Sequence, residues 1–134
     1  IIAAIQAALD DAGLHPDRID TVNAHGTGTP ENDKMEAMGC LAVFGERMRG
    51  VPISSNKSMI GHTLTAAGAI EAAFSLLTIA HGRVPPTLNY AVPDPAIPLD
   101  VVTSARDVPV TTVLSNSFGF GGQNTCLVFG AEPA

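Results

Sequence analysis

Residues 56–62, NKSMIGH, lead directly into the apolar segment 64–80, LTAAGAIEAAFSLLTIA. In that segment Glu71 is the only charged residue, and apolar side chains fall at nearly every helical angle. This pattern is typical of a helix that is buried on all sides. Lysine is seldom buried, so Lys57 and His62 at the start of such a helix suggest a site at its N-terminus. Taken singly, a surface lysine and a histidine bonded to a backbone carbonyl explain them equally well.

Composition and charge narrow the classes of function. The chain has 134 residues, 46% hydrophobic and 15% charged, as expected for one globular domain. Its net charge of −6, without a Lys/Arg cluster, argues against nucleic-acid binding and against a basic membrane-binding face. Cys40 and Cys126 lie far apart without CxxC spacing, which favours a reducing compartment. Because Glu71, Ser75 and Thr78 interrupt the segment 64–80, we expect no membrane span and a soluble, cytoplasmic protein.

Local patterns alternate between helix and strand. The chain starts within a helical pattern, and Asp10 and Asp11 stand where a signal peptide would stay apolar. We predict helices near 1–12, 33–45 and 62–81, the second capped by Asn32 or Asp33, and strands near 19–24, 52–55 and 110–116. A last strand near 125–129 should pair with its predecessor as a hairpin. Residues 85–98 contain five prolines and should cross the surface in an extended form. The alternation predicts an α/β fold with a largely parallel sheet.

Three loops follow predicted strands: HGTGTP at 25–30, the stretch 56–62, and NSFGFGGQN at 116–124. If the strands are neighbours, these loops meet at one end of the sheet, where α/β proteins bind ligands. His25 and His62 could then both donate a ring N–H to one carbonyl oxygen. Gly119 and Gly121 flank Phe120 and would let its backbone N–H approach a ligand, as an oxyanion hole requires.

Other kinds of site fit less well. His25 and His62 with Asp33 or Glu36 could bind a metal ion, but the chain has no HxxxH pair and no thiolate ligand set. The segment FGFGGQN leads into a strand and has no GK[ST], so it does not match a phosphate-binding loop. We therefore predict neither a metal nor a bound cofactor.

Three further polar residues need an explanation. A lone carboxylate such as Glu71 in a buried helix costs several kcal/mol unless it is paired, and Lys57 is the only cation of the stretch 56–62. About 13 Å of helix separates His62 from Glu71 at 1.5 Å per residue, so the pair forms only if the Lys57 loop folds back along the helix. Thr27 and Thr29 are turn hydroxyls by default, and only their position beside His25 makes them candidate ligand contacts.

Together the segments VNAHGTGTP, NKSMIGHTLTAAGAIEA and LSNSFGFGGQN resemble the signature segments of β-ketoacyl-acyl-carrier-protein synthases of the elongating, two-histidine class. These are condensing enzymes of fatty-acid and polyketide synthesis. The resemblance covers essentially the whole chain, with the segments in the right order. It implies that residues 1–134 are the C-terminal domain of such a synthase, one half of a thiolase-like fold with αβαβα layers.

The resemblance also implies roles for individual residues. His25 and His62 would hold the thioester carbonyl of malonyl-carrier protein during decarboxylation, and Lys57, with Glu71 as its partner, would order the site electrostatically. Thr27 and Thr29 would bond the phosphopantetheine arm of the acyl carrier protein. The oxyanion hole and its gate would involve three residues: Phe118, Gly119 and Phe120.

The chain departs from the family pattern in three ways. Thr65 and Gln123 replace a common glycine and a frequent threonine, neither of which carries the chemistry. More seriously, the family's nucleophilic cysteine belongs to an N-terminal half that this sequence does not contain, because Cys40 lies in a predicted helix and Cys126 in a predicted strand. Alone, the chain should therefore be inactive in condensation and expose an apolar face. Its expected partners are the acyl carrier protein, its own N-terminal half and, in the complete enzyme, a second copy.

Two other functions stay open. Chain-length-factor subunits resemble condensing enzymes but are noncatalytic partners, and such a subunit has no chemical need for His25, His62 and Lys57. A thiolase acting on coenzyme A thioesters fits less well, because thiolases have a different histidine motif and a second cysteine. The leading hypothesis is therefore the decarboxylating half of a Claisen-condensing enzyme.

Overall fold

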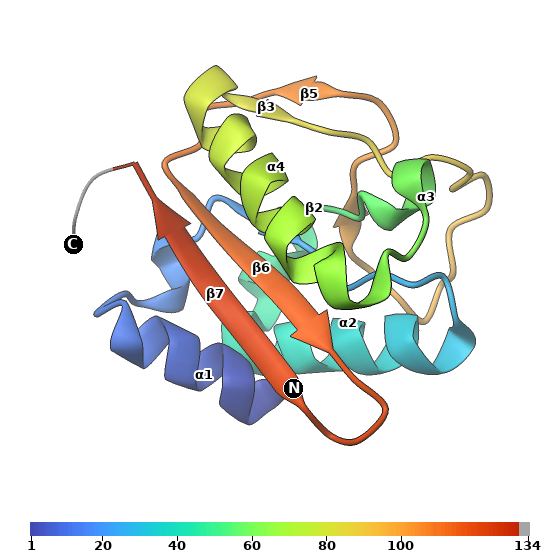
Figure 1. Cartoon of the computed structure of the whole chain (residues 1–134), viewed down its shortest axis with the longest axis horizontal. Coiled ribbons are helices and arrows are strands. Elements are labelled where there is room, and N and C mark those ends of the chain that lie inside the picture. Colours follow the sequence, from blue (N-terminus) through green and yellow to red (C-terminus); the bar gives the residue numbers. More distant parts are fainter. Residues whose placement is uncertain (132–134) are drawn as a thin grey trace.

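A five-stranded sheet runs through the molecule with helices on both faces (Figure 1). The computed structural model describes residues 1–131. The sheet order is β4-β2-β1-β6-β7, and the strands are Thr21–Asn23 (β1), Pro52–Ser54 (β2), Asp100–Val101 (β4), Thr112–Phe118 (β6) and Asn124–Gly130 (β7). The pairs β4-β2, β2-β1 and β1-β6 are parallel, whereas β7 returns antiparallel to β6. The predicted α/β class, its parallel sheet and its C-terminal hairpin are confirmed.

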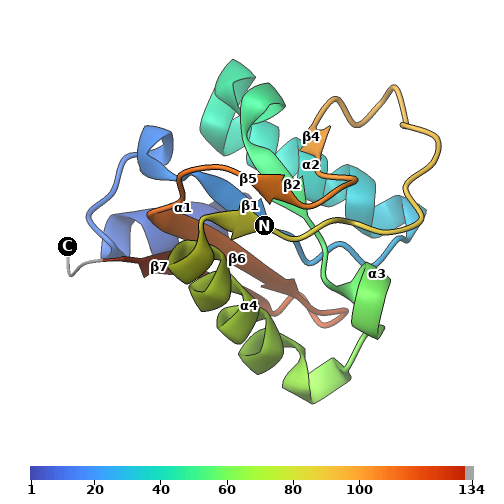
Figure 2. The same cartoon turned by 90° about the horizontal axis from the view of Figure 1, so that it is seen from above.

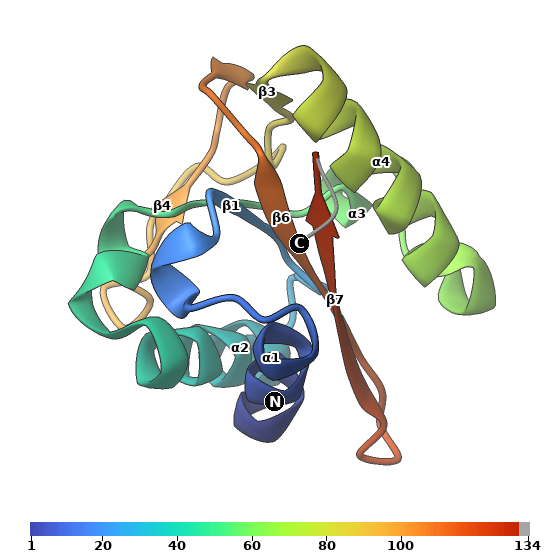
Figure 3. The same ribbon diagram turned by 90° about the vertical axis from the view of Figure 1, so that its left-hand side faces the viewer.

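Helices form the two outer layers. Helix α1 (Ile2–Asp11) and helix α2 (Pro30–Phe44) lie on one face of the sheet, and α4 (Ala67–His81) lies on the other (Figure 3). Short 3₁₀ turns occupy Pro16–Arg18, Gly45–Gly50 and Leu64–Ala66. Helix α2 begins earlier than predicted, because Thr29, rather than Asn32 or Asp33, accepts the capping bond and Pro30 has the backbone angle of a first helical residue.

The larger core lies between the sheet and the α1–α2 layer. Apolar residues at helical spacing in α1, Ile5 and Leu9, are buried together with Phe44 of α2 against Val22 and Leu114 of the sheet. A smaller cluster lies beneath the C-terminal end of α4 and consists of Val84, Val102, Val110 and Val113, with Ile79 packed against it. These two clusters fix the strands whose carboxyl ends carry the candidate site.

The segment between the second predicted strand and α4 differs from the single helix expected over 62–81. It forms a short helix α3 (Lys57–Ile60), then turns at Gly61, and the regular helix α4 starts only at Ala67. Gly61 (φ 76°) and Leu64 (φ 53°) both adopt left-handed backbone conformations, which end α3 and interrupt the helical path. His62 lies between these two turns.

Within this chain, the segment 64–80 is buried on one side only, whereas burial on all sides is expected of the intact protein. The face of α4 that packs on the sheet buries Glu71, Ser75 and Thr78. Leu76 and Leu77 are 52% and 53% exposed on the other side. The helix therefore presents apolar side chains outward, as expected of one half of a larger fold.

The stretch Leu64–His81 is long and apolar enough, by length and composition alone, to cross a membrane. However, its sheet-facing side carries the buried Glu71, which pairs with Lys57. Core helices of soluble proteins have the same composition. The packing of α4 on β6 and β7 is that of a layer of an α/β domain.

Two small strands and the proline-rich segment complete the chain. Strands β3 (Arg83–Val84) and β5 (Arg106–Asp107) pair antiparallel in a separate sheet. After β3, the segment 85–98 runs without regular structure past α3 toward β4 (Figure 2), as predicted from its prolines. We call residues 85–98 the proline strap.

Candidate functional site

The first loop of the site follows β1 and carries His25. The side chain of Glu36, on α2, holds this loop: its Oε1 accepts the backbone N–H of His25 at 2.9 Å, and its Oε2 accepts that of Gly26 at 2.9 Å. His25 is buried, with 8% of its surface exposed. The position of this imidazole is thus set by a carboxylate from the neighbouring helix.

The rings of His25 and His62 meet edge to face, with centroids 5.6 Å apart. Phe118, at the end of β6, packs on the His25 ring at a centroid distance of 5.6 Å. All three segments singled out in the sequence therefore contribute to one place. This is the geometry expected when strands β1, β2 and β6 are neighbours, because their carboxyl ends lie at the same edge of the sheet.

A backbone bond orients the His62 ring. The N–H of Leu64 donates to Nδ1 of His62 at 3.2 Å, which requires an unprotonated Nδ1. The proton of the neutral imidazole is consequently on Nε2, and that nitrogen is a hydrogen-bond donor. The ring is exposed and free to present this donor to a ligand.

Lys57 and Glu71 form a buried ion pair, with side chains 5% and 2% exposed. The pair hypothesised from the sequence is present, because α3 brings Lys57 back along α4. Burial raises the pKa of Glu71, and the Lys57 ammonium opposes that rise. Asn23 of β1 donates to the backbone carbonyl of Glu71 at 3.1 Å, which fixes α4 to the sheet at this point.

Burial is the main reason that His25 is uncharged near neutral pH. The pKa of His25 is lowered to about 4 by three effects, of which burial is the largest, followed by the positive charge of Lys57 and the neighbouring His62. The site therefore combines a neutral imidazole at His25, an Nε2–H donor at His62 and one buried cation. Such a set can polarise a carbonyl oxygen and stabilise negative charge that develops on it.

Glu36 is the residue of the site whose role the sequence did not reveal, since it was considered only as a metal ligand. Besides the two backbone N–H groups of the His25 loop, it accepts from Asn116 at 3.0 Å and from Asn32 at 3.3 Å. The sequence did carry one indication that Glu36 is buried. It lies four residues before Cys40, and residues with this spacing share one face of a helix. Across residues 1–131, no group of three His, Cys, Asp or Glu side chains could hold a metal ion.

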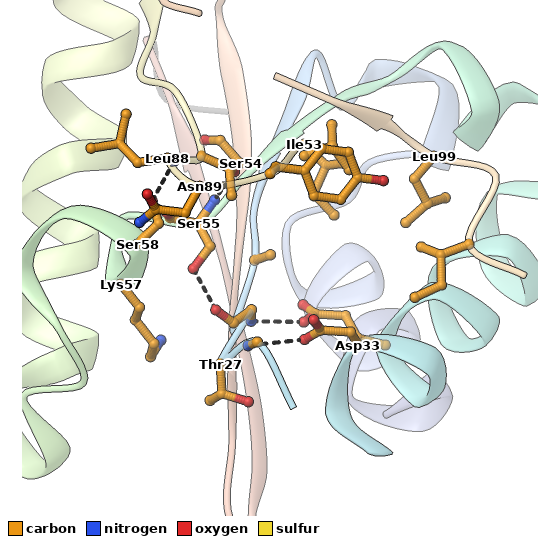
Figure 4. A pocket seen from close by; sticks show the side chains of 18 of the residues that line it. Thr27, Asp33, Ile53, Ser54, Ser55, Lys57, Ser58, Leu88, Asn89 and Leu99 are labelled. Carbon is orange, nitrogen blue, oxygen red and sulfur yellow. Dashed lines mark hydrogen bonds between the residues drawn. The ribbon is translucent and has the colours of Figure 1, made fainter. Parts of the chain in front are cut away.

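A pocket of about 490 Å³ opens beside these loops. Thr27, Lys57 and His62 line it on the loop side, while the proline strap supplies Leu88 and Tyr90. Figure 4 shows Ser55, Ser58 and Leu88 on one side of this pocket and Asp33 on the other.

The remaining predicted site residues lie in different surroundings. Thr27 lines the pocket and its hydroxyl lies 3.1 Å from that of Thr29, which also caps α2. Phe120 lies at the exposed tip of the β6–β7 hairpin, away from the packed His25, His62 and Phe118 rings. The N–H of Gly119 is used within that tip, because it donates to the carbonyl of Gln123 at 2.8 Å.

Both cysteines are buried in the core and free. Burial, with a smaller contribution from the Glu36 carboxylate, raises the pKa of Cys40 far above its ordinary value and that of Cys126 to about 12. Both are thiols rather than thiolates at neutral pH. Neither has the electropositive, accessible surroundings of a reactive cysteine.

Comparison with known proteins identifies the family of this chain. Residues 1–91 match the family described as beta-ketoacyl synthase, C-terminal domain. A 3-oxoacyl-[acyl-carrier-protein] synthase 2 of Staphylococcus aureus (strain COL) is 48% identical over 127 residues, covering 94% of this chain but 31% of the relative. The chain thus spans about a third of that protein's length.

Solved structures share the fold. The ishigamide ketosynthase/chain length factor superimposes with a TM-score of 0.94 at 42% identity, over 98% of this chain and 32% of that one. A type II polyketide synthase ketosynthase, solved with its acyl-carrier protein and bound to the hexaketide, superimposes with a TM-score of 0.95 at 39% identity, again over 98% and 32%. The chain belongs to the beta-ketoacyl synthase family and corresponds to its C-terminal domain.

Proposed function

We propose that residues 1–134 form the C-terminal domain of a β-ketoacyl-acyl-carrier-protein synthase. The complete enzyme would condense an acyl thioester with malonyl-carrier protein in fatty-acid or polyketide synthesis. The observation that carries the proposal is the contact between the His25 and His62 rings beside the buried Lys57–Glu71 pair. Membership of the synthase family gives this constellation its substrate class.

In the proposed reaction, His25 and His62 act on the thioester carbonyl of the malonyl unit. The bond between the malonyl Cα and its carboxylate breaks, carbon dioxide leaves, and the electron pair moves onto the carbonyl oxygen as an enolate. Nε2–H of His62 is a suitable donor to this oxygen, because Leu64 already occupies Nδ1. The enolate carbon then attacks the acyl thioester and expels the thiolate that carried the acyl group. Preorganised donors of this kind typically account for about 2.7–4 kcal/mol each.

Other residues have supporting roles in the proposal. Lys57 supplies a fixed positive charge close to the histidines. Its pairing with Glu71 offsets the free-energy cost of burying that charge. Thr27, in the wall of the pocket, and Thr29 bond the amides of the phosphopantetheine arm. The backbone N–H of Phe120 joins the oxyanion hole when the Phe118–Gly119–Phe120 segment closes over the substrate. That movement would be needed because Phe120 is exposed.

The nucleophilic cysteine would come from the part of the synthase that precedes this chain. Cys40 and Cys126 are unsuited to the role, since both are buried with raised pKa values. The same N-terminal part would cover the outward leucines of α4. The complete enzyme would be a cytoplasmic homodimer that receives its substrates from an acyl carrier protein.

A direct test uses the full-length protein that contains this chain. It is incubated with a carrier protein that bears an acyl primer and with malonyl-carrier protein, without any other enzyme. The masses of the products are measured by mass spectrometry. The proposal predicts a β-ketoacyl product two carbons longer than the primer, with release of carbon dioxide. If the protein binds a ketosynthase partner but forms no product itself, it is a chain-length-factor-like subunit instead.

A further inference from the structure

Gly26 is held from both sides, and Ser55 provides one of those sides. The N–H of Gly26 donates to Glu36 Oε2, whereas its carbonyl oxygen accepts the hydroxyl of Ser55 at 2.7 Å. Ser55 follows β2 and is 5% exposed. It therefore connects the loop that carries His25 to the segment that carries Lys57 and His62.

The two segments approach each other more closely than most residues allow. A Cβ atom added at Gly26 would lie 2.5 Å from Cβ and 2.7 Å from Oγ of Ser55. The space that a side chain at position 26 would need is filled by Ser55. The separation of the two loops is thus fixed by contact as well as by the hydrogen bond.

Ser55 is itself held by the proline strap. Its backbone N–H donates to Oγ1 of Thr87 at 2.9 Å, and its carbonyl oxygen accepts the hydroxyl of Ser58 at 2.8 Å. The hydroxyl of Ser58 in turn accepts the N–H of Leu88 at 2.8 Å. Figure 4 shows Ser55, Ser58 and Leu88 along one wall of the pocket. The hydroxyl, the N–H and the carbonyl of Ser55 therefore all have partners: the first on the His25 loop, the second on the proline strap and the third in helix α3.

We propose that Ser55 is a positioning residue that sets the distance between the His25 loop and the Lys57–His62 segment, and that the proline strap holds it in place through Thr87. The inference rests on the proposed function, because the two segments carry the groups that would act on one carbonyl. A misplacement of about 1 Å in such a pair can lower the rate of the chemical step by roughly a hundredfold.

The test is made in the full-length protein with malonyl-carrier protein decarboxylation as the assay. Ser55→Ala removes the bond to Gly26 without adding atoms, and it should lower kcat roughly tenfold or more while leaving KM within about twofold. Acyl transfer to the nucleophilic cysteine should keep the parental rate. Thr87→Val, which is isosteric but cannot accept the N–H of Ser55, should behave like Ser55→Ala, and Thr87→Ser should restore the parental rate. Ser104→Ala, at an exposed position, is the matched control.

Several results would overturn the inference. A Ser55→Ala variant with parental kcat would show that the serine sets no catalytic distance. Equal losses of decarboxylation and acyl transfer, accompanied by a lower melting temperature, would assign Ser55 a structural role only. A parental protein that does not decarboxylate malonyl-carrier protein would refute the proposed function itself, and this inference with it.

Discussion

At the scale of single residues, the lowered pKa of His25 has consequences for the pH dependence of stability. The imidazole has a pKa of about 4 in the folded protein, against 6.5 for an unperturbed histidine. Between pH 4 and pH 6.5 the His25 imidazole is protonated in the unfolded chain but neutral in the folded protein. The free energy of unfolding is therefore unaffected by His25 above about pH 6.5, and it decreases as the pH falls toward 4.

This predicts that unfolding free energy decreases between pH 6.5 and pH 4 by more in the parental protein than in a His25→Asn variant, which has no proton to bind there. Urea titrations at a series of pH values measure the difference. The NMR titration of the ring should give a midpoint near 4. A midpoint above 7 would mean that His25 is mostly charged at neutral pH and would contradict its role as a neutral donor.

The Lys57–Glu71 pair predicts an asymmetry between single and double variants. Glu71→Gln leaves the buried Lys57 ammonium without its partner and should cost about 3–5 kcal/mol of stability. Replacing both residues, as in Lys57→Met with Glu71→Leu, removes both charges from the interior and should recover most of that loss. Denaturant unfolding of the parental protein and the two variants checks this. If Glu71→Gln were as stable as the parent, the pair would not be buried as the structure has it.

At the scale of elements, α4 shows what the sequence could and could not predict. Its apolar residues at every helical angle indicated a helix covered on all sides, but periodicity cannot say which side faces the sheet of the same chain. The structure packs Glu71, Ser75 and Thr78 inward, because Lys57 and Asn23 satisfy polar atoms of Glu71 there. The outward leucines, Leu76 and Leu77, are the surface that we propose the N-terminal part of the synthase covers.

The candidate site could also be predicted only in part from the sequence. Because loops after neighbouring parallel strands converge, the meeting of His25 and His62 could be predicted on the condition that their strands are neighbours. The Lys57–Glu71 pair could be hypothesised because a buried charge needs a partner. In contrast, the roles of Glu36 and Ser55 depend on hydrogen bonds between segments distant in sequence, and no local pattern encodes them. The break at Gly61 and Leu64 was also missed, since leucine rarely adopts a left-handed backbone.

The outward face of α4 carries a prediction about assembly. In the full-length protein, Leu76→Gln combined with Leu77→Gln should weaken the packing of the N-terminal part on α4, because each buried leucine contributes about 1.5–3 kcal/mol. Thermal unfolding of the full-length protein should show a clearly lower midpoint. Val92→Gln, an 84% exposed position on the proline strap, is the control and should unfold like the parent. Equal midpoints for the double variant would mean that α4 stays exposed in the assembled protein.

At the scale of the whole molecule, this chain alone should lack condensing activity. Its two cysteines are buried thiols and cannot hold an acyl group as a thioester intermediate. Residues 1–134 expressed alone and incubated with radiolabelled acyl-carrier protein should therefore carry no label that survives denaturation. A stable adduct on Cys40 or Cys126 would show that the nucleophile lies within this chain.

The proposed mechanism requires that His25 and His62 act together on the malonyl carbonyl and not on acyl transfer. The most direct measurement compares decarboxylation of malonyl-carrier protein with acylation of the nucleophilic cysteine in His25→Ala and His62→Ala variants of the full-length protein. We expect each variant to lose decarboxylation activity by a factor of about 10²–10³ and to be acylated at the parental rate. A variant that still decarboxylates at the parental rate would show that the substituted histidine does not act in this step.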